Sequence, residues 1–230
     1  MLTGSQNLAA RVAEVRSRIA QAARAAGRDP ASITLIAVSK AKPAEDIRAA
    51  AAVGVTDFGE NYLKEALDKM DRIAEPLIWH FIGHIQSNKT RPIAERFDWV
   101  HSVDRLAVAR RLSEQRPVHA PPLEVCLQVA LVPEPGKGGV EPGATAALAR
   151  EVAALPRLRL RGLMCIPPVA GGREAQRAPF ARLRALRAEL GAAGIVLDTL
   201  SMGMSDDFEA AIAEGATHVR IGTALFGSRA

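Results

Sequence analysis

The chain of 230 residues is 48% hydrophobic and carries a formal net charge of +5. Its apolar runs are short and interrupted, and none approaches the roughly 18 residues of a membrane span. Its basic residues are scattered over helical patterns, and aromatic residues make up only 4% of the chain. This distribution argues against a dedicated nucleic-acid surface and favours a globular protein with one large core.

The first residues contain no continuous apolar stretch of the kind that a secretory signal needs. An amphipathic helical pattern covers residues 8–26 instead. Farther along, Cys126 and Cys165 lie inside apolar, strand-like runs, where small buried thiols are expected rather than a disulfide. We therefore expect a cytoplasmic location.

After the first helix, short strand-like runs alternate with helical patterns. The predicted strands cover residues 33–39, 57–59, 78–83, 99–103, 123–131, 160–166, 199–203 and 218–222. The predicted helices between them cover residues 43–53, 61–73, 87–96, 105–115, 143–154, 174–190 and 206–214.

This alternation favours an α/β fold with parallel strands, and eight strands are the number that closes a (β/α)8 TIM barrel. We predict a single-domain barrel over residues 1–230, with an extra N-terminal helix. An open, doubly wound sheet is the alternative. The absence of a G-x-G-x-x-G motif after the first strand weakens it.

Polar residues follow the predicted strands at the points where the strands end. Lys40 comes directly after the first apolar run, although lysine is seldom buried. The other residues at such ends are Glu60, Asn61, His84, Asp104, Ser205, Gly222 and Thr223. Because the carboxyl ends of barrel strands meet at one rim, these residues predict a polar site there. Lys40 either points into this site or is the first solvated residue past its strand.

The last two strands are followed by a candidate phosphate site. Ser205 is suited to N-cap the helix predicted from residue 206, and helix N-termini bind phosphate. Gly222 permits a close backbone approach, and Thr223 adds a hydroxyl. An ordinary capped helix is the alternative, favoured by the carboxylates of Asp206 and Asp207.

The strand over residues 218–222 alternates polar with aliphatic side chains. Val219 and Ile221 would pack on the surrounding helices, which turns Arg220 into the barrel. A buried guanidinium needs an acceptor, which could be a carboxylate from another strand or a ligand atom.

Five motifs occur in order from about residue 35 to the C-terminus: AVSKAKP, FGENY, WHFIGHIQSNK, GLMCIPP and SMGMSDDFEAAIAEGATHVRIGTALFGSR. Together they closely resemble the pyridoxal phosphate (PLP) homeostasis protein family. Members of that family are single-domain barrels similar to the N-terminal domain of alanine racemase.

The resemblance implies that Lys40 forms a Schiff base with PLP and that Arg220 faces the pyridine nitrogen. It also implies that Ser205, Gly222 and Thr223 hold the phosphate of PLP. The pocket around the cofactor would be lined by Asn61 and Ser201. The family's usual Lys-Ser-Gly stretch reads Lys137-Gly138-Gly139 here, so the hydroxyl of that loop has no counterpart.

An arginine such as Arg220 beside the pyridine nitrogen disfavours most of the reactions that PLP catalyses. A carboxylate beside the ring nitrogen keeps it protonated and makes the ring an electron sink, whereas an arginine cannot accept that proton. Racemisation also needs acid–base groups on both faces of the substrate carbon. In alanine racemase a tyrosine from a second domain serves one face. Here the one tyrosine, Tyr62, lies at a helix start, and His84 is the remaining candidate base.

We therefore expect a PLP-binding protein of intracellular PLP homeostasis, which buffers PLP or delivers it to apo-enzymes without robust catalysis. A weak PLP-dependent amino-acid racemase or lyase is the alternative. A class I aldolase that uses Lys40 and Glu60 on a sugar phosphate is a third possibility. We expect no metal, nucleic acid or membrane partner. We expect the protein to be a monomer.

Overall fold

The computed structural model describes residues 4–132, 138–168 and 171–227. Within these residues, eight strands form a closed parallel barrel in which each strand pairs with the next and β8 pairs with β1. They are β1 (Thr34–Val38), β2 (Asp57–Glu60), β3 (Ile78–Phe81), β4 (Trp99–Val103), β5 (Leu123–Gln128), β6 (Leu158–Met164), β7 (Thr199–Ser201) and β8 (His218–Ile221). The predicted α/β barrel is confirmed.

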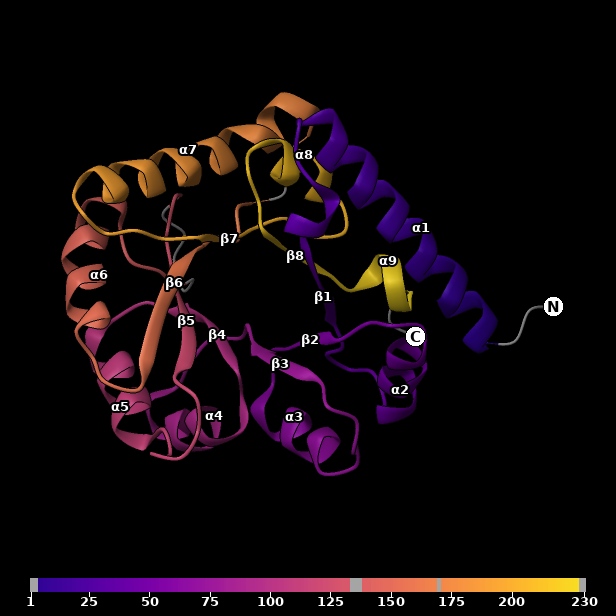
Figure 1. Ribbon diagram of the computed structural model, residues 1–230, viewed down its shortest axis with the longest axis horizontal. Coiled ribbons are helices and arrows are strands. Elements are labelled where there is room, and N and C mark those ends of the chain that lie inside the picture. The colour runs from indigo at the N-terminus through magenta and orange to yellow at the C-terminus, as the bar shows by residue number, and fades with distance from the viewer. Residues whose placement is uncertain (1–3, 133–137, 169–170, 228–230) are drawn as a thin grey trace.

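The helices surround the barrel, and the N-terminal helix runs along one flank (Figure 1). The N-terminal helix α1 (Gly4–Ala25) contacts α2, α8 and α9. The other α-helices are α2 (Ala44–Ala52), α3 (Leu63–Met70), α4 (Thr90–Arg96), α5 (Leu106–Gln115), α6 (Thr145–Ala153), α7 (Arg173–Ala192), α8 (Phe208–Ala213) and α9 (Thr223–Phe226). Short 3-10 helices cover Pro30–Ser32, Ser87–Lys89 and Pro142–Ala144.

Several predicted elements differ from the observed ones at their carboxyl ends. β5 ends at Gln128 rather than Leu131, and β7 ends at Ser201 rather than Gly203. Single backbone hydrogen bonds continue past both ends, from Val129 to Met164 and from Arg220 to Gly203, but outside a regular strand. The helix α9, which follows β8, was not predicted, since a helix of four residues is too short to have a periodic apolar pattern.

The apolar core lies mainly between the barrel and its helices. Among its largest fully buried side chains are Phe58, Phe97, Phe180 and Phe208. The barrel interior is different, because several polar side chains there are at most 4% exposed: His80, His101, Ser201 and Arg220. Barrel interiors are usually filled by branched aliphatic residues. These buried polar groups must therefore satisfy one another's hydrogen bonds.

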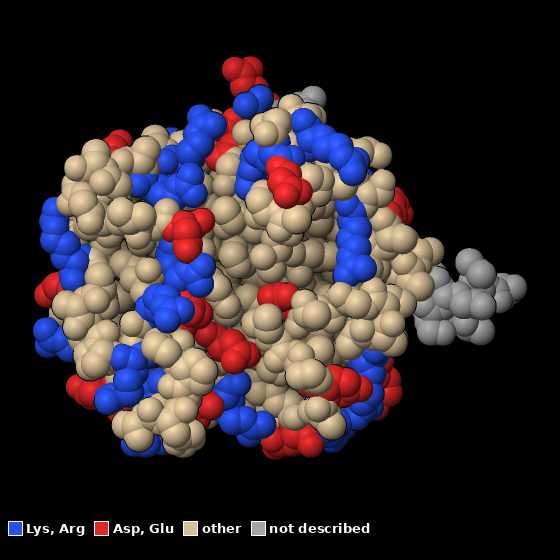
Figure 2. Space-filling model, viewed as in Figure 1, with Lys and Arg blue, Asp and Glu red and all other residues tan. Residues whose placement is uncertain are grey.

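The two cysteines are free and buried, as expected from their strand-like surroundings. Burial raises the pKa of the Cys165 thiol to about 12 and also raises the pKa of Cys126, so both thiols stay protonated. None of the helices in the described ranges is long and apolar enough to cross a membrane. Basic and acidic side chains are interspersed over the face seen in Figure 2.

Candidate functional site at the barrel rim

Lys40 lies two residues after the end of β1, and the residue between them, Ser39, is held by a buried ion pair. Lys69 of α3 donates from Nζ to the Ser39 carbonyl oxygen at 2.7 Å and to Glu60 Oε1 at 2.7 Å. The Ser39 hydroxyl donates to the same carboxylate oxygen at 2.6 Å. Both the backbone and the side chain of Ser39 are therefore bonded to this pair.

The residue after Lys40 is held by the same helix. Ala41 has a left-handed backbone, with φ of 58°, and its N–H donates to Glu65 Oε1 at 2.5 Å. Glu65 also pairs with Lys69 one turn later on α3. The backbone on both sides of Lys40 is thus anchored to one buried lysine, which fixes where the Lys40 side chain starts.

Glu60 does not have the position that the sequence suggested. It is the last residue of β2 and fully buried, not a rim residue that follows the strand. Burial raises the pKa of its carboxyl, while hydrogen bonds from Lys69 and Ser39 oppose the rise. Its second oxygen, Oε2, is buried without a hydrogen-bond partner among the described residues. Glu60 therefore stabilises the backbone before Lys40 through its bonds to Ser39 and Lys69, and it is not an acid group at the rim.

The loops after β7 and β8 meet next to the end of β1. The backbone N–H of Ala224 donates to Ser205 Oγ at 3.3 Å, which joins the two loops. Gly222 packs against β1, since a Cβ there would lie 3.2 Å from the carbonyl oxygen of Val38. Thr223 begins α9 and is exposed. Ser205, Gly222 and Thr223 therefore share the sector of the rim that contains the end of β1.

The predicted N-cap role of Ser205 is wrong. Helix α8 begins at Phe208, and Asp207 is its N-cap residue. The backbone N–H of Met204 donates to Asp207 Oδ1 at 2.6 Å, so the aspartate closes a local turn before the helix. Burial raises the pKa of Asp207, while Asp206 is exposed. The Ser205 hydroxyl instead accepts a hydrogen bond from the backbone N–H of Ala224 in α9, the helix that follows β8.

Arg220 points into the barrel, as its alternation along β8 predicted. It is 4% exposed and donates from Nη1 to Ser201 Oγ at 2.8 Å and from Nη2 to the Cys165 carbonyl oxygen at 2.9 Å. These two partners are uncharged, so the carboxylate that a structural ion pair would need is not among its direct hydrogen bonds. Burial lowers the pKa of this guanidinium.

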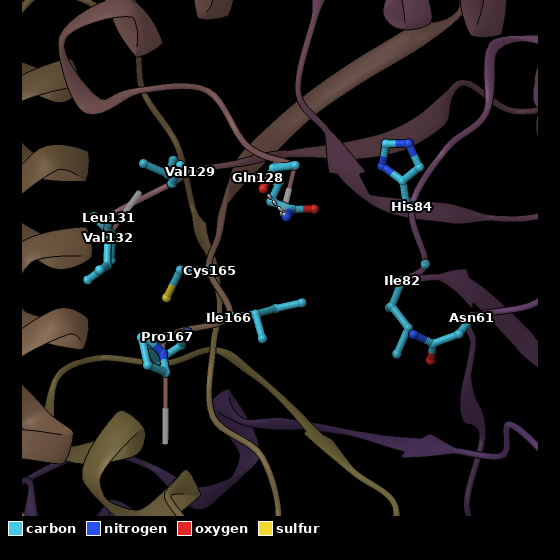
Figure 3. Close-up of a pocket in the computed structure, with 14 residues that line it drawn as sticks. Asn61, Ile82, His84, Gln128, Val129, Leu131, Val132, Cys165, Ile166 and Pro167 are labelled. Atoms are coloured by element: carbon cyan, nitrogen blue, oxygen red, sulfur yellow. Dashed lines mark hydrogen bonds between the residues drawn. The ribbon is translucent and has the colours of Figure 1, made fainter. Parts of the chain in front are cut away.

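A cavity of about 240 Å³ opens at the mouth of the barrel. In Figure 3, Asn61, Ile82 and His84 face Val129, Leu131 and Cys165 across it. Asn61 Oδ1 is buried without a hydrogen-bond partner in the described part of the chain. Cys165 lines the cavity, and its carbonyl oxygen is the acceptor for Arg220. The cavity therefore has an unsatisfied acceptor, Asn61 Oδ1, on one side. On the opposite side it is lined by Cys165, whose carbonyl oxygen binds the buried guanidinium of Arg220.

The Lys137-Gly138-Gly139 stretch, which departs from the family pattern, contributes Gly138 to the lining of this cavity. Lys137 lies outside the described residues, but the Gly138 carbonyl accepts a hydrogen bond from Gln128 Nε2 at 2.6 Å. A Cβ at position 138 would lie 2.8 Å from Asp104 Oδ2 and 3.3 Å from His84 Nδ1. A serine at this position would require the Asp104 side chain to move, so a glycine fits the observed packing.

The predicted site residues form two groups on either side of β1. Ser201 contacts Arg220 directly, and Ser205 bonds to the loop that contains Gly222 and Thr223. Asn61 lies at the cavity, after β2. Because β1 lies between β8 and β2, Lys40 stands between the groups. Sequence reasoning missed Lys69, for which a Glu–Lys pair at i,i+4 with Glu65 was the one available signal.

Three histidines lie close together inside the barrel. The ring centroids of His80, His101 and His218 are 5.2 to 6.4 Å apart. Burial lowers the pKa of His218 to about 4 and holds that of His101 well below its usual value. His101 and His218 are therefore neutral at pH 7.

This cluster predicts a loss of stability in mild acid. Above pH 6.5, His218 is neutral in both the folded and the unfolded chain. Between pH 6.5 and 4 the unfolded chain takes up the proton first, so the free energy of unfolding falls. His218 alone should lower it by about 2–3 kcal/mol at pH 4.5 relative to pH 7.5. Urea unfolding at the two pH values measures this loss.

The variant His218→Phe should lose less stability over that pH interval than the wild type, because it has no proton to take up. The variant His119→Gln, at an exposed histidine, is the matched control and should behave like the wild type. An equal loss in His218→Phe and the wild type would show that His218 is not buried in its neutral form.

The fold and the rim together define a class of protein. A closed parallel barrel with a lysine after its first strand and hydroxyl residues after its last two strands corresponds to the family model "Alanine racemase, N-terminal domain", which matches residues 11–230. Alanine racemase from Corynebacterium glutamicum has the same fold, with a TM-score of 0.68 at 19% identity over 94% of this chain and 60% of that one.

Closer relatives narrow this class. The chain is 63% identical over 223 residues to the pyridoxal phosphate homeostasis protein of Pseudomonas aeruginosa, covering 96% of each chain. It is 48% identical over 227 residues to the protein of the same name from Escherichia coli strain K12, covering 97% of each. The chain therefore belongs to the pyridoxal phosphate homeostasis protein family, as the motifs indicated.

A solved structure of one relative contains the cofactor. PipY of Synechococcus elongatus PCC7942, in a structure with PLP bound, is 41% identical to this chain. The match covers 96% of this chain and all of that one, with a TM-score of 0.85.

Proposed function

We propose that this protein binds PLP at the barrel rim, holds it as a Schiff base on Lys40, and serves intracellular PLP homeostasis by buffering the cofactor or delivering it to apo-enzymes. The observation that carries the proposal is the PLP-bound structure of PipY, whose full length matches this chain at 41% identity. The names of the curated relatives support the same role.

The residues at the rim fit this cofactor. Lys40 supplies an amine at a loop that is fixed on both sides. Next to it, the Ser205 hydroxyl and the backbone around Gly222 and Thr223 offer donors for a phosphate group. On the other side, the buried and unsatisfied oxygen of Asn61 calls for a donor from a ligand. These groups would hold the phosphate and one polar edge of the ring.

When bound, PLP supplies an aldehyde, which a neutral lysine amine attacks to form a C=N bond with loss of water. Lys40 is the amine in this proposal. Arg220 approaches from inside the barrel, where it stays a hydrogen-bond donor because a guanidinium has no acceptor. It does not help to protonate the ring nitrogen, which keeps the ring a weak electron sink. This arrangement favours binding over catalysis.

The alternative, a weak racemase or lyase, has one observation in its favour. His84 lines the cavity and is exposed to an incoming ligand, so it could exchange a proton with a substrate carbon. Tyr62, at 55% exposure, precedes α3 and does not line this cavity. Racemase activity would therefore depend on His84.

One experiment separates these functions. The protein is loaded with PLP, dialysed, and mixed either with L-alanine or with an apo form of a PLP-dependent enzyme. We expect retained PLP, no measurable D-alanine, and activation of the apo-enzyme. Failure to retain PLP would contradict the proposal. Formation of D-alanine that is lost in His84→Gln would favour the racemase.

A further inference from the structure

Five polar side chains form a continuous chain of hydrogen bonds across the interior of the barrel. Arg220 Nη1 is 2.8 Å from Ser201 Oγ, which is 2.8 Å from His101 Nδ1. His101 Nε2 is 2.9 Å from His80 Nδ1, and His80 Nε2 is 2.9 Å from Asp57 Oδ1. The residues come from five different strands, β8, β7, β4, β3 and β2. We call this set the interior chain.

The two ends of the interior chain set the direction of every bond in it. Arg220 can only donate, and an ionised Asp57 can only accept. Although burial opposes ionisation, hydrogen bonds from His80 and Thr56 hold the pKa of Asp57 below its usual value. Each group between the ends must then accept from the Arg220 side and donate toward Asp57.

This direction assigns the histidine tautomers. His101 carries its proton on Nε2 and accepts the Ser201 hydroxyl at Nδ1. His80 likewise carries its proton on Nε2, donates it to Asp57, and accepts from His101 at Nδ1. Both rings are neutral in this arrangement, which agrees with the burial of His101. Between the two ends, the Ser201 hydroxyl and all four histidine ring nitrogens have hydrogen-bond partners, as buried networks require.

The interior chain gives Arg220 a remote counter-charge. Its direct partners, Ser201 and the Cys165 carbonyl, are neutral, whereas a buried cation without compensation is costly. Bonds that all point the same way polarise one another, so the Asp57 carboxylate strengthens Ser201 as an acceptor for Arg220. Cys165 also lines the cavity at the mouth of the barrel, so its bond to Arg220 connects the guanidinium to the cavity wall.

We propose that Asp57, His80, His101 and Ser201 are positioning residues that hold Arg220 as an oriented donor toward the ring nitrogen of bound PLP. This inference rests on the proposed PLP site. The four residues act through Arg220, and Asp57 does so from β2, outside the group of residues that line the cavity.

His218 provides a matched control within the same cluster. Its ring lies 6.1 Å from the His101 ring and 6.4 Å from the His80 ring, so it shares their packing. Its Nδ1 bonds to Thr217 Oγ1 at 2.9 Å, outside the interior chain. A change at His218 therefore alters packing near the network without interrupting it.

The test compares the dissociation constants of PLP and of its 1-deaza analogue, in which a C–H group replaces the ring nitrogen. The variants are His101→Phe, which breaks the interior chain, Asp57→Asn, which keeps the shape and removes the charge, and His218→Phe. We expect His101→Phe to weaken PLP binding about tenfold and Asp57→Asn about threefold. Neither His101→Phe nor Asp57→Asn should change the dissociation constant of the deaza analogue. The His218→Phe variant should bind both PLP and the analogue as the wild type does.

Each outcome has a distinct meaning. Equal weakening of both ligands would identify a purely structural role and overturn the inference, as would no weakening of either. If His101→Phe does not fold by circular dichroism, Asp57→Asn decides the question alone. A wild-type protein that binds neither ligand would overturn the proposed function, and this inference with it.

Discussion

Replacing Lys40 with alanine is expected to abolish the long-wavelength aldimine band that the wild-type protein retains after PLP is added and the excess is dialysed away. The band requires a covalent C=N bond, and Lys40 is the lysine that follows β1 between the two groups of predicted site residues. The loss of the aldimine band should be complete, since PLP that is held only by hydroxyl and backbone contacts to its phosphate remains an aldehyde. Absorbance spectra of the dialysed proteins measure it.

The matched control is Lys42→Ala. Lys42 lies in the same loop, but its Nζ donates to the carbonyl oxygen of Phe226 at 3.2 Å, at the end of α9. We expect this variant to keep the band. If Lys42→Ala lost the band and Lys40→Ala kept it, PLP would be bound to Lys42, which would contradict the proposed site.

Replacing Lys69 with methionine is expected to destabilise the protein by about 3–5 kcal/mol. The change leaves Glu60 as a buried carboxylate without its cation and removes the donor to the Ser39 carbonyl. Since the residues around Lys40 are anchored here, PLP binding should weaken as well. Urea unfolding measures the first effect, and titration with PLP the second.

Two further variants make this prediction specific. Lys64→Met changes an exposed lysine on the same helix and should alter the free energy of unfolding by no more than about 0.5 kcal/mol. The double variant Lys69→Met with Glu60→Gln should be less destabilised than the sum of the single changes, because it removes both charges of the pair. Equal stability of Lys69→Met and Lys64→Met would show that the buried pair is absent.

Much of the fold could be predicted because barrel strands and helices leave local patterns. The strand over 99–103 was predicted with its observed bounds, and the other strands differ by a few residues at their ends. The alternation of polar and aliphatic residues around Arg220 was enough to orient its side chain inward. These signals depend on near neighbours in the sequence, which is why they can be read without a structure.

The parts of the site that were missed depend on contacts between distant residues. The pairing of Glu60 with Lys69 requires α3 to fold back over β2, and a lysine in a helix usually suggests an exposed face. The bond between His80 and His101 requires the register of β3 against β4, where His80 lies opposite Trp99. No local pattern contains that information. Ser205 was given a capping role for the same reason, since its partner Ala224 comes from the distant helix α9.

The central claim is that Lys40 holds PLP covalently. The most direct test is to load the protein with PLP, reduce the C=N bond with borohydride, and locate the modified lysine by peptide mass spectrometry. We expect a phosphopyridoxyl group on the peptide that contains Lys40. Modification confined to another lysine, or none at all after loading, would contradict it.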